Sequence, residues 1–206
     1  MWMFEIPPFV PFFLGALFAA FTRGKLRGAI MVALPLLSAI HLWTVPEGIH
    51  LQFAFLDYQL IPYRVDRLSL LFGYVFHIAA FIGIIYSLHV RDTLQQVAAM
   101  LYAGAGLGAV FSGDLLTLFV FWELLAFTSV FLIWARRTRR SYFAGMRYLL
   151  VQVLSGVILL VGALFYAAEN GTLEFGYIGL HGIAGWLIFL AFGIKCAFPL
   201  LHSWLT

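Results

Sequence analysis

Long apolar runs, interrupted at intervals by charged residues, prolines and glycines, dominate this chain. A helix that spans a membrane needs about 20 predominantly apolar residues, and seven runs approach that length. We therefore predict an all-α, polytopic membrane protein with about seven transmembrane helices. The predicted spans are residues 6–21, 28–44, 68–90, 94–112, 115–134, 142–168 and 183–201.

The boundary between the fourth and fifth spans depends on helix length and on one turn. Residues 94–134 carry no charge except Asp114 and Glu123. As one helix they would measure about 61 Å, which is about twice the hydrocarbon thickness of a bilayer. Ser112-Gly113-Asp114 is typical of a turn, so we place the turn there, with Asp114 as the N-cap of the fifth span.

Other local signals refine this pattern. Pro7 and Pro8 are expected in the first turn of the first span, where proline costs little. Residues 45–63 form the only sizeable piece between spans, and their alternating segment 50–55 predicts a short strand or hairpin outside the membrane. Asp66 is expected at the start of the third span, where the helix dipole favours an acid.

Basic residues are distributed unequally between the two sides of the predicted bundle. One side carries nine and the other carries only Arg64 and Arg67. Because cytoplasmic loops are enriched in lysine and arginine, we predict an N-terminus outside and a multi-pass protein of the cell membrane. The first apolar run has the acidic Glu5 and no basic n-region, so we interpret it as a span and not as a signal peptide. The nine basic residues are Arg23, Lys25, Arg27, Arg91, Arg136, Arg137, Arg139, Arg140 and Arg147.

Composition excludes a soluble enzyme. Hydrophobic residues make up 64% of the 206 residues and charged residues only 10%, against about 25% charged in soluble domains. The single cysteine, Cys196, excludes an intrachain disulfide and a cysteine-rich metal or iron–sulfur site. No phosphate-binding loop, dinucleotide fingerprint, zinc spacing or nucleophile elbow occurs, so we predict no cofactor, no metal site and no nucleic-acid partner.

Two charged residues lie where a membrane protein should have none. Glu123 is nine residues from Asp114 and eleven from Trp134, and Lys195 is twelve residues into the last span. Each costs about 2.5–3.5 kcal/mol at the centre of a spanning helix. Such residues persist when they pair with one another or line a hydrated cavity.

The two buried charges admit two interpretations. One is a static Glu123–Lys195 ion pair that holds two helices together, and the other is a proton relay whose lysine gains and loses its proton. Gly193 and Pro199 favour the relay, because they predict a helix broken at Lys195, and broken membrane helices line ion pathways. His202, at the inner end of the last span, either passes protons between Lys195 and the cytoplasm or lies at the membrane interface by chance, whereas His77 fits a packing role better than a relay.

Three stretches of the chain resemble a known family. They are Val65-Asp66-Arg67-Leu68-Ser69, residues 113–124 with Phe121-Trp122-Glu123-Leu124, and residues 192–205 with Lys195, Pro199 and His202-Ser203-Trp204-Leu205. The family is that of the antiporter-like membrane subunits shared by respiratory complex I, Mrp-type cation/proton antiporters and membrane-bound hydrogenases, and the motifs most resemble those of the D-type component of the Mrp-type antiporters. The resemblance implies that Glu123 tunes a neighbouring lysine, that Lys195 binds the transferred proton, and that His202 belongs to a loop signature.

The resemblance covers only the first half of a family subunit. Family members are built as inverted repeats, and the second lysine site and second half-channel are absent here. We therefore expect residues 1–206 to form a single transmembrane domain, either as part of a longer polypeptide or completed by another chain.

The expected function is that of a proton-conducting subunit of a cation/proton (Na⁺/H⁺) antiporter complex, not of an enzyme. Its expected partners are other subunits, the lipid bilayer, protons and a monovalent cation. The alternative is a proton-pumping subunit of a complex I-like NADH/quinone oxidoreductase or a hydrogenase. A scaffold subunit without an ion path is a lesser alternative. A retinal-binding seven-helix protein is disfavoured, because residues 68–90 offer no carboxylate counter-ion.

Overall fold

The computed structural model describes residues 6–202 and 204, and Glu5, Ser203 and Leu205 of the sequence predictions lie outside these residues. A helix lies at each of the seven predicted positions, and an antiparallel hairpin stands between the second and third helices. The elements are α1 (Val10–Phe21), α2 (Gly24–Leu42), β1 (Gly48–Phe55), β2 (Tyr58–Val65), α3 (Arg67–Ser87), α4 (Thr93–Phe111), α5 (Leu115–Trp134), α6 (Arg139–Asn170) and α7 (Gly182–Lys195).

The predicted class of polytopic membrane protein is confirmed by the lengths of these helices. Within the described residues, five helices, α2 to α6, are long and apolar enough to cross a membrane. The apolar helices α1 and α7 are shorter, with 12 and 14 residues. A count of seven spans therefore stays a prediction.

The start of α1 corrects one sequence expectation. The helix begins at Val10 and not at residue 6, so Pro7 and Pro8 precede it instead of occupying its first turn. The residue before a proline is disfavoured in the helical region, and consecutive prolines therefore delay the helix. Pro11 is the proline that occupies the first turn, where a missing N–H costs little.

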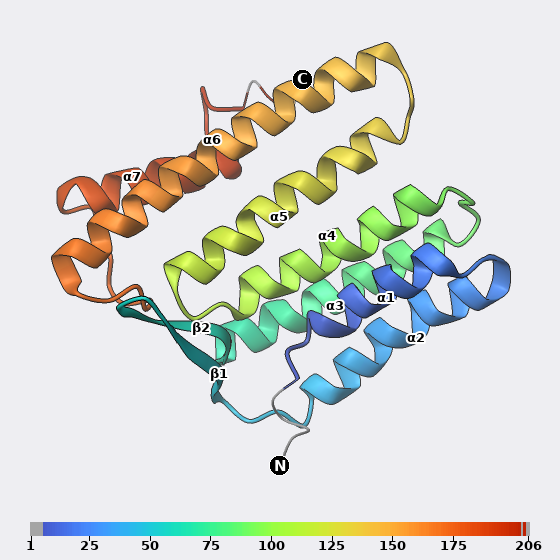
Figure 1. Ribbon diagram of the computed structural model, residues 1–206, viewed down its shortest axis with the longest axis horizontal. Helices are drawn as coiled ribbons and strands as arrows, with labels where there is room; N and C mark the ends of the chain where they lie inside the picture. Colours follow the sequence, from blue (N-terminus) through green and yellow to red (C-terminus); the bar gives the residue numbers. More distant parts are fainter. Residues whose placement is uncertain (1–5, 203, 205–206) are drawn as a thin grey trace.

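The helices pack around α4 and α5, which lie side by side in the middle of the bundle (Figure 1). On one side α1, α2 and α3 surround a first core; on the other, α6 and α7 pack on α5 around a second. Buried side chains of the first core include Phe12, Met31, Leu107 and Phe111, and the second core contains Leu115, Trp122, Leu159 and Ile188.

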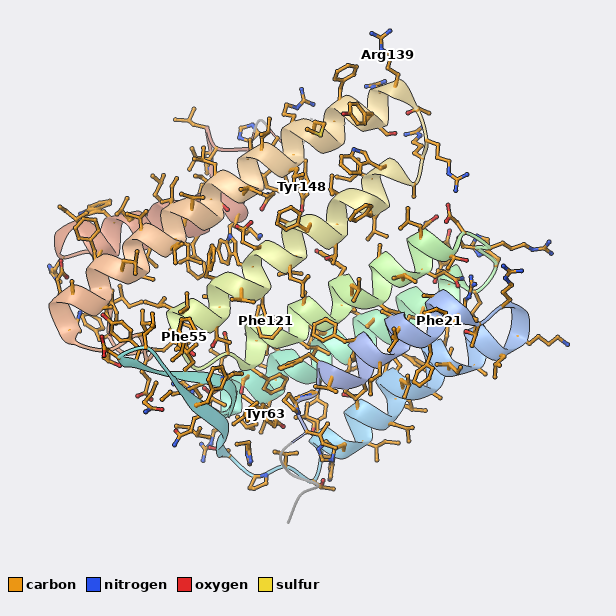
Figure 2. The ribbon with its side chains drawn as sticks, viewed as in Figure 1. Phe21, Phe55, Tyr63, Phe121, Arg139 and Tyr148 are labelled. Carbon is orange, nitrogen blue, oxygen red and sulfur yellow. The ribbon has the colours of Figure 1, made fainter. Side chains whose placement is uncertain are left out.

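Consecutive connections alternate between the two ends of the bundle. The α1–α2, α3–α4 and α5–α6 connections share one end, and the hairpin and the α4–α5 and α6–α7 connections share the other (Figure 1). Arg137 bonds Asp92 at 2.7 Å, which links two of the connections at the first end. Figure 2 shows Arg139 at this end and Phe55 at the opposite one. We call residues 22–27, 88–93 and 135–140 together the basic end.

The hairpin predicted between the second and third spans is present. Its register runs from Gly48 opposite Val65 to Phe55 opposite Tyr58. Tyr63 is fully buried, with its ring centroid 5.8 Å from that of Phe111 on α4. Burial raises the pKa of the Tyr63 hydroxyl, which has no hydrogen-bond partner within the described part of the chain. The hairpin is therefore docked on the bundle by an aromatic side chain.

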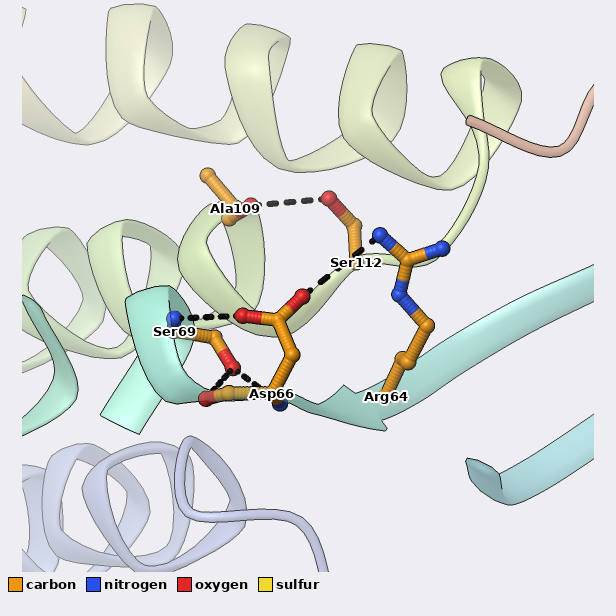
Figure 3. Close-up of polar contacts among 5 residues, drawn as sticks. All are labelled: Arg64, Asp66, Ser69, Ala109 and Ser112. Atoms are coloured by element: carbon orange, nitrogen blue, oxygen red, sulfur yellow. Dashed lines mark hydrogen bonds and ion pairs between the residues drawn. The ribbon is translucent and has the colours of Figure 1, made fainter. Parts of the chain in front are cut away.

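Asp66 caps α3, as the sequence predicts. Its carboxylate accepts a hydrogen bond from the Ser69 backbone N–H at 2.8 Å, and the Ser69 hydroxyl oxygen accepts one from the Asp66 N–H (Figure 3). Arg64 lies 3.6 Å from the same carboxylate. Such a reciprocal cap satisfies two N–H groups that the first helical turn leaves free.

Asp114 caps α5, which also confirms the prediction. Its fully buried carboxylate accepts hydrogen bonds from the Thr117 N–H at 2.7 Å, the Thr117 hydroxyl at 2.6 Å and the Ile61 N–H of β2 at 2.6 Å. The next residue, Leu115, donates its N–H to the Leu173 carbonyl at 2.9 Å. These bonds fix the start of α5, and with it the depth of every side chain on that helix.

Candidate functional site

The two ionisable residues singled out in the sequence come together in the second core. Glu123 lies on α5, about 13 Å along the helix axis from the Asp114 cap, and Lys195 is the last residue of α7. Their charges are near enough to interact electrostatically. The fold therefore joins two segments that are 72 residues apart in the sequence.

Lys195 is held by the residue that precedes Glu123. Its Nζ donates a hydrogen bond to the Trp122 carbonyl oxygen at 3.0 Å and lies 4.7 Å from the centroid of the Trp122 ring. The second contact is a cation–π interaction, which strengthens when water is excluded. Lys195 is also the last residue of α7, and the helix dipole favours a cation near the C-terminus of a helix.

Glu123 makes no ion pair with Lys195 within residues 6–202 and 204. Its Oε1 atom is buried and has no hydrogen-bond partner there. A buried polar atom without a partner costs about 1–3 kcal/mol, and more when it is charged. The arrangement differs from a static clasp, in which the carboxylate would occupy the place that the Trp122 carbonyl takes.

Gly156 of α6 makes room for the Glu123 carboxylate. A Cβ atom built on Gly156 would collide with Oε1 of Glu123. Only a residue without a side chain lets the carboxylate rest directly against the α6 backbone. The position of Glu123 therefore depends on α6 as well as on α5.

Trp122 is itself fixed by α6 and α7. Its indole N–H donates to the Ser155 hydroxyl at 3.0 Å, and that hydroxyl donates to the Gln152 carbonyl at 2.8 Å. The ring of Phe192 meets the Trp122 ring edge-on, with centroids 4.8 Å apart. The sequence analysis did not single out Ser155 or Gly156, because small residues in mid-span are common wherever membrane helices pack closely.

Helix α7 ends at Lys195, six residues before the end of the predicted span at 201. The Phe198 N–H turns back to the Gly193 carbonyl at 2.9 Å, and Ala197 and Leu200 adopt positive φ angles of 55° and 74°. Pro199 has no N–H with which to continue a helix. The lysine thus stands where the backbone leaves the helical conformation.

In the described residues, no hydrogen bond or ion pair joins either histidine to this pair. His202 is exposed, and no hydrogen bond joins it to Lys195 in the described part of the chain. His77 is buried in the first core, where its ring bonds the Gly73 carbonyl at 2.7 Å and the Ser38 hydroxyl at 2.9 Å. These contacts agree with the packing interpretation of His77.

Comparison with known proteins identifies the relatives of this chain. Residues 112–206, which contain both Glu123 and Lys195, match the family described as NADH:quinone oxidoreductase/Mrp antiporter, transmembrane. The chain is related to the antiporter-like membrane subunits. The resemblance inferred from its sequence motifs is therefore confirmed.

Two relatives come from different branches of the family, and a solved structure shares the fold. The D-type component of a Na(+)/H(+) antiporter of Bacillus subtilis is 33% identical over 125 residues, which cover 56% of this chain and 25% of the relative. Hydrogenase-4 component B of Escherichia coli is 29% identical over 176 residues, 74% of this chain and 24% of the relative. A chain of respiratory complex I from Thermus thermophilus shares the fold, with a TM-score of 0.77 at 21% identity over 96% of this chain and 45% of that chain.

The matched part of this chain therefore spans only about a quarter of the length of these curated relatives. The chain is similar both to an antiporter component and to a hydrogenase component, and these similarities do not choose between the two branches.

Proposed function

We propose that this chain is the proton-conducting part of an antiporter-like subunit in a cation/proton antiporter complex, and that Lys195 and Glu123 form its proton relay. The observation that carries the proposal is the bonding of Lys195 to the Trp122 carbonyl, one residue away from a carboxylate oxygen that has no partner in the described residues. The match to the Bacillus subtilis antiporter component supports the choice of branch.

The chemistry of the two acceptors explains how such a relay works. A backbone carbonyl accepts a hydrogen bond but does not take the proton, whereas a carboxylate does both. At Trp122 the Lys195 side chain therefore has a hydrogen-bond partner but no base that could take its proton. In this proposal Nζ gives up its proton after it turns to a base, and we propose Glu123, one residue along α5, as that base. The end of α7 at Lys195 gives the side chain the backbone freedom that this movement needs.

In this proposal the seven helices all cross the cell membrane, with the N-terminus outside, α7 broken at Lys195 and the basic end in the cytoplasm. The alternation of connections and the gathering of arginines at one end support this orientation. His202, seven residues beyond Lys195 and exposed, is proposed as the proton exit toward the cytoplasm. In the proposed complex, the other subunits assemble with this chain, and a monovalent cation is exchanged for protons.

The alternative is a proton-pumping subunit driven by a redox reaction, as in a complex I-like oxidoreductase or a hydrogenase. The match to hydrogenase-4 component B of Escherichia coli favours it. Inverted vesicles distinguish the two: an added sodium pulse drives proton movement in an antiporter, whereas an electron donor is required in a redox-driven complex.

Substitutions in the assembled complex test the relay. Lys195→Ala is expected to abolish cation/proton exchange in inverted vesicles while the complex still assembles, because alanine removes both the proton site and a costly charge. Glu123→Gln is expected to impair transport. Glu47→Gln, which changes an exposed acid of the hairpin region, is the matched control and should transport normally.

A residue exchange separates the relay from a structural clasp. A plain salt bridge has no direction, so Glu123→Lys combined with Lys195→Glu would preserve it. In the relay the exchange must fail, because a carboxylate at position 195 would face the Trp122 carbonyl and two acceptors repel. Parental transport by Lys195→Ala, or by the exchanged pair, would overturn the proposal.

A further inference from the structure

A groove of 1310 Å³ opens at the basic end, between α2 and the α3–α4 connection. Residues of α2 form one wall, residues 88–91 form the other, and Gln96 of α4 lies at its base. It is remote in the fold from the Glu123–Lys195 pair, which lies between α5 and α7. The proton relay makes no use of it.

The groove carries positive charge that the protein does not neutralise. None of its lining residues is acidic. Asp92, the acid next to it in the sequence, is bonded to Arg137 at 2.7 Å. The exposed basic side chains of the groove make no ion pair in the described part of the chain. The basic residues that line it are Arg23, Lys25, Arg27 and Arg91.

Arg27 is the buried member of these four basic residues, and hydrogen bonds hold its side chain in place. It is only 6% exposed; its Nε donates to the Thr22 carbonyl at 2.8 Å and its Nη1 to the Gln96 side-chain oxygen at 3.4 Å. Gln96 in turn donates to the Val90 carbonyl at 2.6 Å. All three residues are neutral, so the guanidinium is fixed in place while its charge stays uncompensated.

The rest of the groove is lined mainly by apolar residues of α2, and it runs along this helix from the basic residues toward Leu36. Gly28, Val32 and Leu36 recur at every fourth residue, which places them on one face of the helix. Ala33 and Leu88 complete this apolar wall. From Lys25 to Leu36 it extends about 16 Å. The groove is therefore charged at the end of the bundle and apolar along the part that crosses the membrane.

We infer that this groove binds one anionic phospholipid, with its phosphate among the four basic residues and an acyl chain along the apolar wall of α2. Charge and shape both select this ligand. A soluble anion gains nothing from the apolar wall, and a lipid without net charge gains little from the basic residues. Basic pockets between membrane helices are suited to anionic lipid head groups. The inference needs the membrane setting of the chain but not proton transport.

Native mass spectrometry of the purified full chain, with phosphatidylglycerol or phosphatidylcholine added, tests this inference. One phosphatidylglycerol is expected to remain bound in preference to phosphatidylcholine. Lys25→Ala with Arg91→Ala should weaken phosphatidylglycerol binding about 30-fold, since each interfacial basic residue contributes about fivefold in affinity. The matched control is Arg136→Ala with Arg140→Ala, which removes the same charge from the same end without touching the groove.

Two further measurements identify the source of the anion. Ala33→Trp fills the apolar wall at constant charge and should also reduce retention of the lipid. Excess inorganic phosphate should not displace it. Equal losses in the two double variants, unchanged retention in Ala33→Trp, or full displacement by phosphate would each overturn the inference.

Discussion

Gly156→Ala offers the sharpest test of how Glu123 is positioned. The added Cβ would occupy the place of the Glu123 Oε1 atom, so either the carboxylate or the α5–α6 packing must move. Overpacking of this kind costs about 1–3 kcal/mol. Replacing a mid-helix glycine by alanine returns about 0.5–1 kcal/mol. The net loss is small against a typical stability of about 5–15 kcal/mol, and we expect the complex to assemble.

The effect on transport should be larger than the effect on stability. If the strain of about 1–3 kcal/mol falls on the geometry of the Glu123–Lys195 pair, the rate of proton transfer falls about 5- to 150-fold. The assay is cation/proton exchange in inverted vesicles, normalised to the amount of assembled complex. Gly83→Ala is the matched control, because a Cβ there meets nothing within 4 Å, and it should transport at the parental rate.

A second substitution shows whether the collision itself causes the defect. Glu123→Asp shortens the side chain by one methylene and withdraws the carboxylate from position 156. Combined with Gly156→Ala it should restore part of the transport that Gly156→Ala alone loses, which is a coupling between neighbouring residues. Parental transport by Gly156→Ala would refute the idea that the glycine sets the place of Glu123.

Three further predictions concern stability, measured by thermal unfolding in detergent. Asp114→Ala should destabilise the protein by at least about 3 kcal/mol, because a helix cap and two other bonds to a buried carboxylate are lost; an unchanged melting temperature would contradict this. Ser38→Ala should cost about 1–3 kcal/mol by leaving a ring nitrogen of buried His77 without its partner. Tyr63→Phe should be neutral or stabilising by up to about 1 kcal/mol, since its buried hydroxyl has no partner in the described residues.

The helices could be predicted from the sequence because each is a long apolar run bounded by polar or turn residues. The predicted helix boundaries differ from the structure where apolar residues do not adopt the helical conformation. Pro7 and Pro8 extend the first apolar run, yet they stand before α1. Residues 196–201 are mostly apolar and belong to the predicted span, but α7 ends at Lys195, the residue at which Gly193 and Pro199 predict a break, and Ala197 and Leu200 have positive φ angles. Hydropathy measures the preference for lipid and not the backbone conformation.

The site was predictable only in part, for a similar reason. Glu123 and Lys195 are conspicuous as charges within apolar runs. The features that position them are not conspicuous in the sequence. Lys195 bonds a backbone carbonyl, and Glu123 fits against α6 because position 156 is a glycine. Both depend on how closely α5, α6 and α7 approach one another, and that distance arises from the packing of the whole second core.

The two acceptors on α5 also limit what can drive the proposed relay. Hydrogen bonds from an ammonium group to a carbonyl or a carboxylate differ by only a few kcal/mol, so Lys195 can exchange between Trp122 and Glu123. Reversing such an equilibrium from 1:99 to 99:1 requires a change in bias of about 5.5 kcal/mol. A membrane potential of about 100 mV supplies only about 2.3 kcal/mol per elementary charge that crosses the full bilayer, and less for a movement of a few ångströms. The potential alone therefore cannot switch the lysine completely. In the proposed relay, protonation of Glu123 or a displacement of α6 transmitted through Gly156 would have to provide the remainder.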